Sequence, residues 1–331
     1  ENVKGSGGKD QLAGRYSGNL CQGASQLYGG QRTGGEDALL NCAYGKPSGK
    51  IWRRDTAFSG RLCHRCQAHR PSPGRPWKLG AEFKEEKGCL WGRTRGLHGG
   101  EIFFPRSSVG ATQNAVLGAV CAKGTTVIRG CSIEPEVSWL CRFLNQAGGK
   151  IRGTGTSCLV IQGVSGLHDT VFQIPSDRIA AGTYVCASAI TRGKGILLDP
   201  PVGEMGSLLK AYEKIGGQYT YKSGKLFLCS QRASGSLCRL ETGIYPGFPT
   251  DLQSIFLAVL ACARGESLIR ENIFEDRFKV VPQLQKMGAQ ITLDGRIARI
   301  QGGRLLGALV KAEELRGGAA LVVAGLGAEG E

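Results

Sequence analysis

The stretch LNQAGGKIRGTGTSCLVIQGV, residues 144–164, shows the plan on which most of the chain is built. The order of its apolar and polar residues indicates the end of a helix, a glycine with a small neighbour, a strand, a turn and a second strand. Gly148 suits the left-handed residue that ends a helix, and a small residue after it lets the strand pack closely against that helix. The stretch therefore predicts one α/β unit.

The same plan occurs three more times along the chain. KLGAEFKEEKGCLWGR begins at residue 78, YEKIGGQYTYKSGKLFLC at residue 212 and LQKMGAQITLDGRIARIQG at residue 284. The equivalent glycines are 68, 68 and 72 residues apart: Gly80, Gly148, Gly216 and Gly288. Solenoid repeats are shorter, at about 20 to 50 residues. We therefore predict a globular α/β fold made of related units of about 70 residues.

Composition places the protein in a broad class. At 331 residues and 41% hydrophobic, the chain can bury one large core or two ordinary ones. Its 13 cysteines are irregularly spaced and mostly lie in apolar runs such as YVCASAI, which predicts reduced thiols and a cytoplasmic location. No signal segment is visible at the first residues, and the longest apolar run, near residues 255–263, is too short to span a bilayer. We expect no membrane partner.

Basic residues are concentrated at the start of the chain. The net charge is +15, which usually indicates nucleic acid or an anionic surface as a partner. Residues 1–78 hold 13 Lys and Arg against 5 Asp and Glu, yet few aromatic residues accompany them, so no stacking platform for single strands is evident. We do not expect nucleic acid binding. A non-catalytic basic scaffold that binds nucleic acid remains the alternative function.

Two kinds of candidate site follow from spacing. Ser107 and Ser108, with Arg106 beside them, precede an apolar helix pattern and suit either an anion cradle or an ordinary helix cap. Asp177 and Asp251 each stand where a helix is predicted to begin. A carboxylate there is more often a cap or first-turn residue than a catalytic base.

Nine motifs, in order, resemble those of one enzyme family. They are SVGAT, GTTVIRG, EPEV, FLNQAGGKI, DRIAAGTY, YPGFPTDLQ, FEDRF, PQLQKMGA and LRGGAALVVAGL, within a match from about residue 78 to the last residue. The series resembles the UDP-N-acetylglucosamine enolpyruvyl transferases. The shikimate-phosphate enolpyruvyl transferases share the fold but not this set of motifs. ENVKGSGGKDQLAGRYSGN also resembles the family's first strand pair, with a Lys-Asn motif reduced to Gly18 and Asn19.

The resemblance implies a fold and a reaction. The expected architecture is a two-domain α/β fold of six related units, an inside-out α/β barrel in which sheets enclose a ring of helices. We expect domain one at residues 20–175 and domain two at residues 1–19 plus 176–331, without the family's last strand-helix unit. The implied reaction transfers enolpyruvyl from phosphoenolpyruvate to the 3-hydroxyl of UDP-N-acetylglucosamine, the first committed step of peptidoglycan synthesis. These two small molecules are the implied partners, with no cofactor and no metal.

The resemblance also implies roles for individual residues. Asp251 matches the general base that contacts the sugar hydroxyl, and Arg277 matches the catalytic position at the phosphate or carboxylate of phosphoenolpyruvate. Substrate binding is implied at nine further positions: Asn19, Arg106, Ser108, Val109, Gly110, Ile273, Glu314, Leu315 and Arg316. Ser108, Val109 and Gly110 match contacts to the diphosphate. On spacing alone, Arg277 and Arg316 would each be interpreted as a surface ion pair.

Three positions differ from the family pattern. Glu314 replaces the aspartate of an Asp-Leu-Arg motif, and its extra methylene should displace the carboxylate by about one bond length, which matters where alignment supplies much of the rate. Ile133 and Ala180 replace the family's usual Arg and Glu. At these two positions the resemblance therefore does not imply the family's polar links around the hinge.

The segment CHRCQAHRPSPGRPW, residues 63–77, has two interpretations. Cys63 and Cys66, with His64 and His69 nearby, would suit tetrahedral zinc. No second ligand pair stands at a finger-like distance, however, which disfavours the zinc site.

The second interpretation is a shift of reading frame. The family's mobile loop should carry a cysteine in a GC-A-IG-A-RP-x-D-LH motif at this distance upstream. Codons allowed for residues 61–73, read one base later, permit GCAIGARPIDLHL, and residues 37–52 in that frame permit MRSSIVLTGNLLAKFG, another family block. We therefore predict that the catalytic loop is translated out of frame, with a deletion between Asn19 and Asp37. Residues 20–77 should be irregular, and the chain should be inactive.

Overall fold

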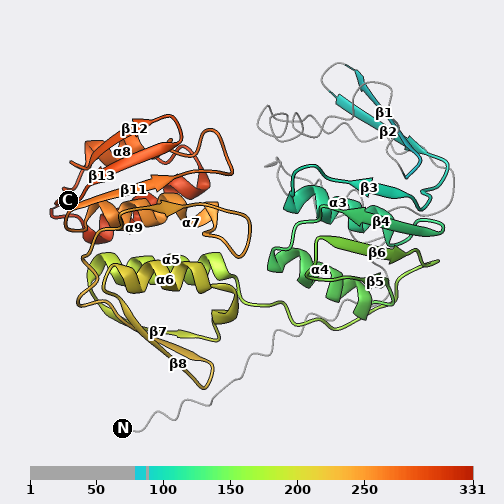
Figure 1. The fold of residues 1–331 in the computed structure, drawn as a ribbon, viewed down its shortest axis with the longest axis horizontal. Helices are drawn as coiled ribbons and strands as arrows, with labels where there is room; N and C mark the ends of the chain where they lie inside the picture. The colour runs from blue at the N-terminus through green and yellow to red at the C-terminus, as the bar shows by residue number, and fades with distance from the viewer. Residues whose placement is uncertain (1–78, 87–88, 331) are drawn as a thin grey trace, which may run out of the picture. The chain divides into compact units, whose positions relative to one another are not determined.

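The computed structural model describes residues 79–86 and 89–330, which divide into two units between Gln173 and Ile174 (Figure 1). We call residues 79–173 unit 1 and residues 174–330 unit 2. The predicted beginning of domain one at residue 20, and the predicted assignment of residues 1–19 to domain two, lie outside the described residues. So do the expected irregular segment and the candidate zinc ligands.

Unit 1 is a two-layer α/β arrangement. Its four-stranded sheet has the order β3-β4-β6-β5, in which β3 is parallel to β4 and the other pairs are antiparallel. The strands are β3 Glu101–Phe103, β4 Thr125–Arg129, β5 Lys150–Arg152 and β6 Cys158–Gln162, and the helices are α3 Val109–Ala119 and α4 Pro135–Gln146. Both helices contribute apolar side chains to one core with the sheet. A separate hairpin pairs β1 Ala81–Glu86 with β2 Cys89–Thr94.

Unit 2 contains two sheets with helices between them (Figure 1). The first sheet has the order β7-β9-β8, from β7 Lys194–Leu198, β8 Gln218–Lys222 and β9 Lys225–Cys229. The second has the order β10-β11-β13-β12, from β10 Leu240–Glu241, β11 Glu266–Arg270, β12 Gln290–Asp294 and β13 Ile297–Gln301. The helices are α5 Arg178–Thr191, η2 Val202–Glu204, α6 Gly206–Lys214, α7 Thr250–Ala261, α8 Val281–Lys286 and α9 Leu315–Gly327.

The predicted repeat is confirmed by strand order. The sheet β3-β4-β6-β5 and the sheet β10-β11-β13-β12 both begin with a parallel pair and end with an antiparallel hairpin. The sheet β7-β9-β8 follows the same order without the first strand. An α/β fold made of related units is therefore what the chain forms.

The repeated glycines adopt the predicted backbone conformation. Their φ angles are +85, +96, +97 and +89° at Gly80, Gly148, Gly216 and Gly288. Two of them are followed by a second glycine that leaves no room for a side chain, because a Cβ at Gly149 would lie 2.7 Å from the Leu144 carbonyl oxygen and one at Gly217 would lie 2.4 Å from the Tyr212 ring. In these two repeats the glycine pair thus ends the helix and allows the strand to lie close to it.

Helices form the centre of unit 2. α5, α7 and α9 pack against one another, and every residue of α7 from Leu252 to Ala261 is buried. Side chains of both sheets join them in one continuous core. This agrees with the expected helices enclosed by sheets. Over the described ranges, no helix is both long and apolar enough to cross a membrane.

Candidate functional site

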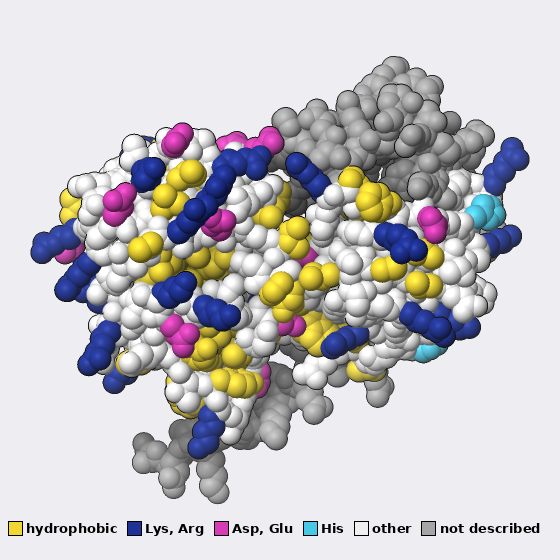
Figure 2. Space-filling model, in the orientation of Figure 1, with side chains coloured by type: hydrophobic (Ala, Val, Ile, Leu, Met, Phe, Trp, Pro, Cys, Tyr) yellow, Lys and Arg dark blue, Asp and Glu magenta, His cyan; other side chains and the backbone are white. Residues whose placement is uncertain are grey.

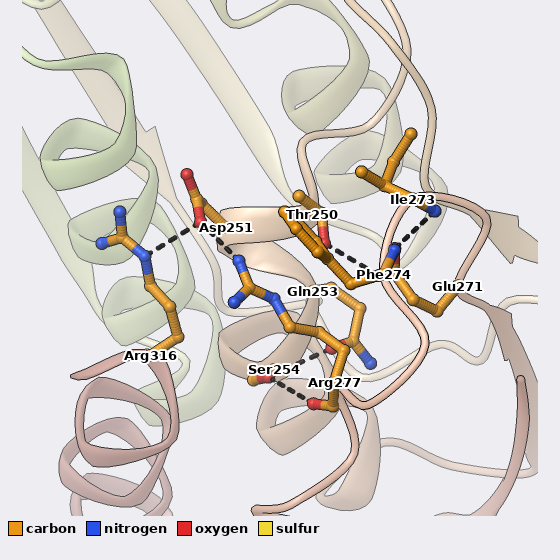
Figure 3. A network of polar contacts seen from close by, with 9 residues as sticks. All are labelled: Thr250, Asp251, Gln253, Ser254, Glu271, Ile273, Phe274, Arg277 and Arg316. Carbon is orange, nitrogen blue, oxygen red and sulfur yellow. Dashed lines mark hydrogen bonds and ion pairs between the residues drawn. The ribbon is translucent and has the colours of Figure 1, made fainter. Parts of the chain in front are cut away.

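Two arginines from distant segments meet at one carboxylate in unit 2 (Figure 3). Asp251 lies in the first turn of α7, and its Oδ1 is 2.6 Å from Nη2 of Arg277 and 3.1 Å from Nε of Arg316. The side chain of Arg277 is only 10% exposed, whereas that of Asp251 is 38% exposed. The structure therefore brings together three of the predicted site residues, with the carboxylate partly open to solvent.

Arg277 is held by several neighbours at once. Its guanidinium carbon is 4.8 Å from the centre of the Phe274 ring, a cation–π contact. Its carbonyl oxygen lies 3.4 Å from the hydroxyl of Ser254, on the second turn of α7. The Nε of Arg277 is buried without a hydrogen-bond partner among the described residues. Unpaired buried donors are rare in folded proteins and are expected where function requires them.

Glu271 supports this cluster, although no sequence pattern points to it. It follows the last residue of β11 and is completely buried. Its Oε1 accepts hydrogen bonds from the backbone N–H of Ile273 at 2.8 Å and of Phe274 at 3.0 Å. Its Oε2 accepts from the hydroxyl of Thr250 at 2.9 Å (Figure 3). A single charged residue after a strand is usually exposed. Only the folded chain therefore shows that Glu271 is buried and supports the cluster.

The beginning of α9 carries the predicted Glu-Leu-Arg segment. Glu314 has the extended backbone of an N-cap, with φ −147° and ψ 163°, but its side chain makes no capping hydrogen bond. Its Oε1 is buried without a partner among the described residues, and its Cγ lies 3.4 Å from where a Cβ of Gly317 would stand. Leu315 is 79% exposed, and Arg316 points to Asp251. The Glu314 carboxylate therefore forms no hydrogen bond to the helix amides.

The predicted anion site of unit 1 lies at the N-terminus of α3. Ser108 is the N-cap, with its Oγ accepting from the N–H of Ala111 at 3.4 Å. Arg106 and Gly110 are exposed, and a Cβ at Gly110 would meet nothing within 4 Å. Val109 is the first residue of the helix. The cap is therefore established, and Gly110 is the exposed residue of the first turn.

The two candidate aspartates have different roles in their helices. Asp177 is the N-cap of α5, and its Oδ1 accepts from the N–H of Ile179 at 2.7 Å. Asp251 instead lies inside the first turn of α7, after an N-cap formed by Pro249, and binds arginines rather than helix amides. The cap interpretation is confirmed for Asp177. Asn19 lies outside the described residues, which also contain no grouping of three His, Cys, Asp or Glu suited to a metal ion.

Comparison with known proteins identifies the family. The family model for EPSP synthase (3-phosphoshikimate 1-carboxyvinyltransferase) matches residues 78–331. The chain is 42% identical over 254 residues to UDP-N-acetylglucosamine 1-carboxyvinyltransferase 2 of Caldanaerobacter subterraneus subsp. tengcongensis, a match that covers 76% of this chain and 61% of that protein. It is 41% identical over 255 residues to UDP-N-acetylglucosamine 1-carboxyvinyltransferase of Desulfovibrio desulfuricans, with the same coverage of both. The chain therefore belongs to the 1-carboxyvinyltransferase, or enolpyruvyl transferase, family.

Solved structures show the same fold. The enolpyruvyl transferase NikO from Streptomyces tendae aligns with a TM-score of 0.68 at 22% identity, over 76% of this chain and 63% of that one. EPSP synthase from Acinetobacter baumannii aligns with a TM-score of 0.56 at 20% identity, over 77% of this chain and 65% of that one. The predicted enolpyruvyl transferase fold is thus confirmed. The chain spans about 61% of the length of the curated relatives that it matches.

Proposed function

We propose that the Asp251 cluster, made of Asp251, Arg277 and Arg316, binds UDP-N-acetylglucosamine and phosphoenolpyruvate for enolpyruvyl transfer. The observation that carries the proposal is the convergence of Arg277 and Arg316 on a partly exposed carboxylate at the start of a buried helix. Relatives named for this reaction at about 42% identity support the substrate assignment. Within unit 1, the N-terminus of α3 at Ser108 is proposed by itself as an anion contact, because a helix N-terminus with a nearby arginine favours anions.

The geometry suits addition followed by elimination. Both arginines bind Oδ1 of Asp251, and no described residue is bonded to its Oδ2, which is left to accept the proton of the sugar 3-hydroxyl. The hydroxyl oxygen then bonds to C2 of phosphoenolpyruvate while C3 takes a proton from a general acid, which we assign to the family's mobile loop. Elimination breaks the bond from C2 to the phosphate oxygen, releases phosphate and returns a proton from C3 to that group, which restores the double bond. Arg277 and Arg316 would stabilise the negative charge of phosphate and carboxylate groups.

Turnover should nevertheless be absent in the chain as written. Residues 61–73 do not spell the cysteine-containing loop motif of the family in the frame that is translated. A lid contributes proton transfer and excludes water, and general acid–base assistance is worth about 10² to 10⁴ in rate. The proposed site therefore retains substrate contacts but not the full catalytic apparatus.

Phosphate release and nucleotide binding test the two parts of this proposal separately. With both substrates present, we expect no phosphate release above background. We expect weak binding of UDP-N-acetylglucosamine that is reduced in Arg316→Ala, while the exposed variant Arg304→Ala serves as a control. Failure to bind the nucleotide sugar at millimolar concentration would disprove the substrate assignment. Clear turnover that is abolished by Asp251→Asn would show that the lost loop is dispensable.

Buried cysteines and surface charge bear on the cellular location of the protein and on the alternative function, nucleic acid binding. Cys141 and Cys186 are completely buried free thiols, a use of cysteine that fits the reducing cytoplasm. On the face drawn in Figure 2, Lys and Arg side chains are scattered over the described residues, with Asp and Glu side chains among them. Nucleic acid proteins usually gather basic residues into a patch or stripe. We therefore do not propose a nucleic acid partner.

A further inference from the structure

We propose that Glu271 is a positioning residue that fixes the Asp251 carboxylate and the loop of residues 272–277 in one geometry, and that this coupling governs recognition of the sugar. The second half of the proposal rests on the proposed function. Glu271 touches neither arginine of the cluster in the contacts described above, so it acts through its neighbours.

The two oxygens of Glu271 bind different structural elements. Oε2 accepts from Thr250, the first residue of α7 and the chain neighbour of Asp251. Oε1 accepts from two consecutive backbone amides of the loop that leads to Arg277. Because Arg277 in turn binds Asp251 at 2.6 Å, the contacts form a closed ring that joins helix and loop (Figure 3). Breaking the ring at Glu271 should loosen the loop and the first turn of α7 together.

The chemistry of the three partners favours a carboxylate at this position. Each of them donates a hydrogen bond, and an ionised carboxylate is an acceptor only. Hydrogen bonds to a charged acceptor are stronger than those between neutral groups. Burial of a carboxylate costs free energy unless its oxygens accept hydrogen bonds. Glu271 is completely buried, and its three hydrogen bonds offset that cost and hold the start of α7 and the loop rigidly together.

The loop also has an independent anchor, which predicts that removal of Glu271 acts locally. Asn272 donates from its backbone N–H to Oγ1 of Thr242 at 2.8 Å and from its side chain to the Thr242 carbonyl at 3.0 Å. These bonds attach the first residue of the loop to the end of β10. Without Glu271, the loop should remain attached there and become mobile from Ile273 onward.

Hydrogen exchange of the loop amides tests positioning without any ligand. In Glu271→Ala, we expect exchange at Ile273 and Phe274 to accelerate at least about tenfold, as for the loss of a hydrogen bond to a charged group. Glu271→Gln should restore slow exchange, since its carbonyl can accept from both amides and its NH₂ can donate to the Thr250 hydroxyl. Glu275→Ala is the matched control, because that carboxylate lies in the same loop but is exposed and pairs only with Arg296 among the residues that the structure describes. Unchanged exchange in Glu271→Ala would overturn the proposal.

Binding of two nucleotides then separates positioning from general stability. For Glu271→Ala, we expect affinity for UDP-N-acetylglucosamine to fall about tenfold and affinity for UDP to change less than about twofold, both measured by calorimetry. Equal weakening of both ligands would indicate a merely structural role and refute the inference. If the unsubstituted chain binds neither ligand, the proposed function fails and the sugar half of this inference fails with it, while the exchange data still decide whether Glu271 holds the loop. Should Glu271→Ala not fold, Glu271→Asp, which shortens the arm by one methylene, replaces it in both measurements.

Discussion

Replacing Glu314 by aspartate should stabilise unit 2. Glu314 already has the extended backbone of an N-cap at the start of α9, but its side chain provides no cap and buries Oε1 without a partner among the described residues. Asp177, whose side chain is one methylene shorter, forms such a cap at the N-terminus of α5, with its Oδ1 2.7 Å from the N–H of Ile179. In Glu314→Asp, we expect the carboxylate to accept from the N–H of Arg316 or Gly317.

The magnitude follows from three terms. An N-cap side chain contributes about 0.5 to 2 kcal/mol. Relief of a buried unpaired oxygen adds about 1 to 3 kcal/mol, and loss of one buried methylene subtracts about 0.8 kcal/mol. The charge near the helix N-terminus is unchanged, so the helix dipole contributes nothing to the difference. The three terms leave a net gain of about 0.7 to 4 kcal/mol, and each kcal/mol should raise Tm by about 2 to 4 °C for a unit of this size.

Thermal and urea unfolding of three variants would check the argument. Glu314→Asp and Glu314→Ser should both be more stable than the parent chain, because either side chain can cap, whereas a purely electrostatic gain would exclude serine. Asp177→Ala is the reverse control and should lose about 1 kcal/mol. If Glu314→Asp is no more stable than the parent, the buried oxygen and the missing cap of Glu314 do not lower the free energy of unfolding, and the inference is wrong.

Two further predictions concern buried side chains of unit 2. Tyr212→Phe should cost about 1 kcal/mol in urea unfolding, because the buried hydroxyl lies 2.6 Å from Oγ of Ser230, whereas Tyr221→Phe, at a half-exposed ring, should be neutral; equal effects would contradict this. Burial raises the pKa of the Cys262 thiol to about 11, so little reactive thiolate is present at pH 8. Peptide mapping after alkylation at pH 8 should find exposed Cys238 modified well before Cys262, whose rate should rise as pH approaches 11; the opposite order would refute the assignment.

The repeated units were predictable because their determinants are local. A glycine with positive φ at a helix end is a property of one residue, and a period of about 70 residues reveals its recurrence at Gly148 and Gly216. The meeting of Arg277 and Arg316 on Asp251 is different, since these partners are 26 and 65 residues away along the chain. No local pattern specifies such contacts, and only the family resemblance indicated them.

Local sequence also could not separate the two aspartates or identify the buried glutamate. Asp177 and Asp251 each stand two residues after a proline, and their different roles depend on whether the helix begins one residue after the aspartate or one residue before it. Glu271 is buried because α7 and the loop after β11 enclose it, which is a consequence of tertiary packing. The reading-frame prediction concerns residues 20–77, outside the described residues, and stays a prediction.

Burial of α7 from Leu252 to Ala261 would tie occupancy of the proposed substrate site to the folding of unit 2. A helix that is buried on all sides depends on tertiary packing for its stability, so α7 can only persist together with the helices around it. Asp251 lies in its first turn, and a bound substrate that holds Asp251 therefore also holds the centre of the core in place. A ligand that binds only the folded state adds RT ln(1 + [L]/Kd), which is about 2.7 kcal/mol at a hundredfold excess over Kd. Protection of unit 2 from proteolysis should then follow the substrate concentration even in a chain that completes no reaction.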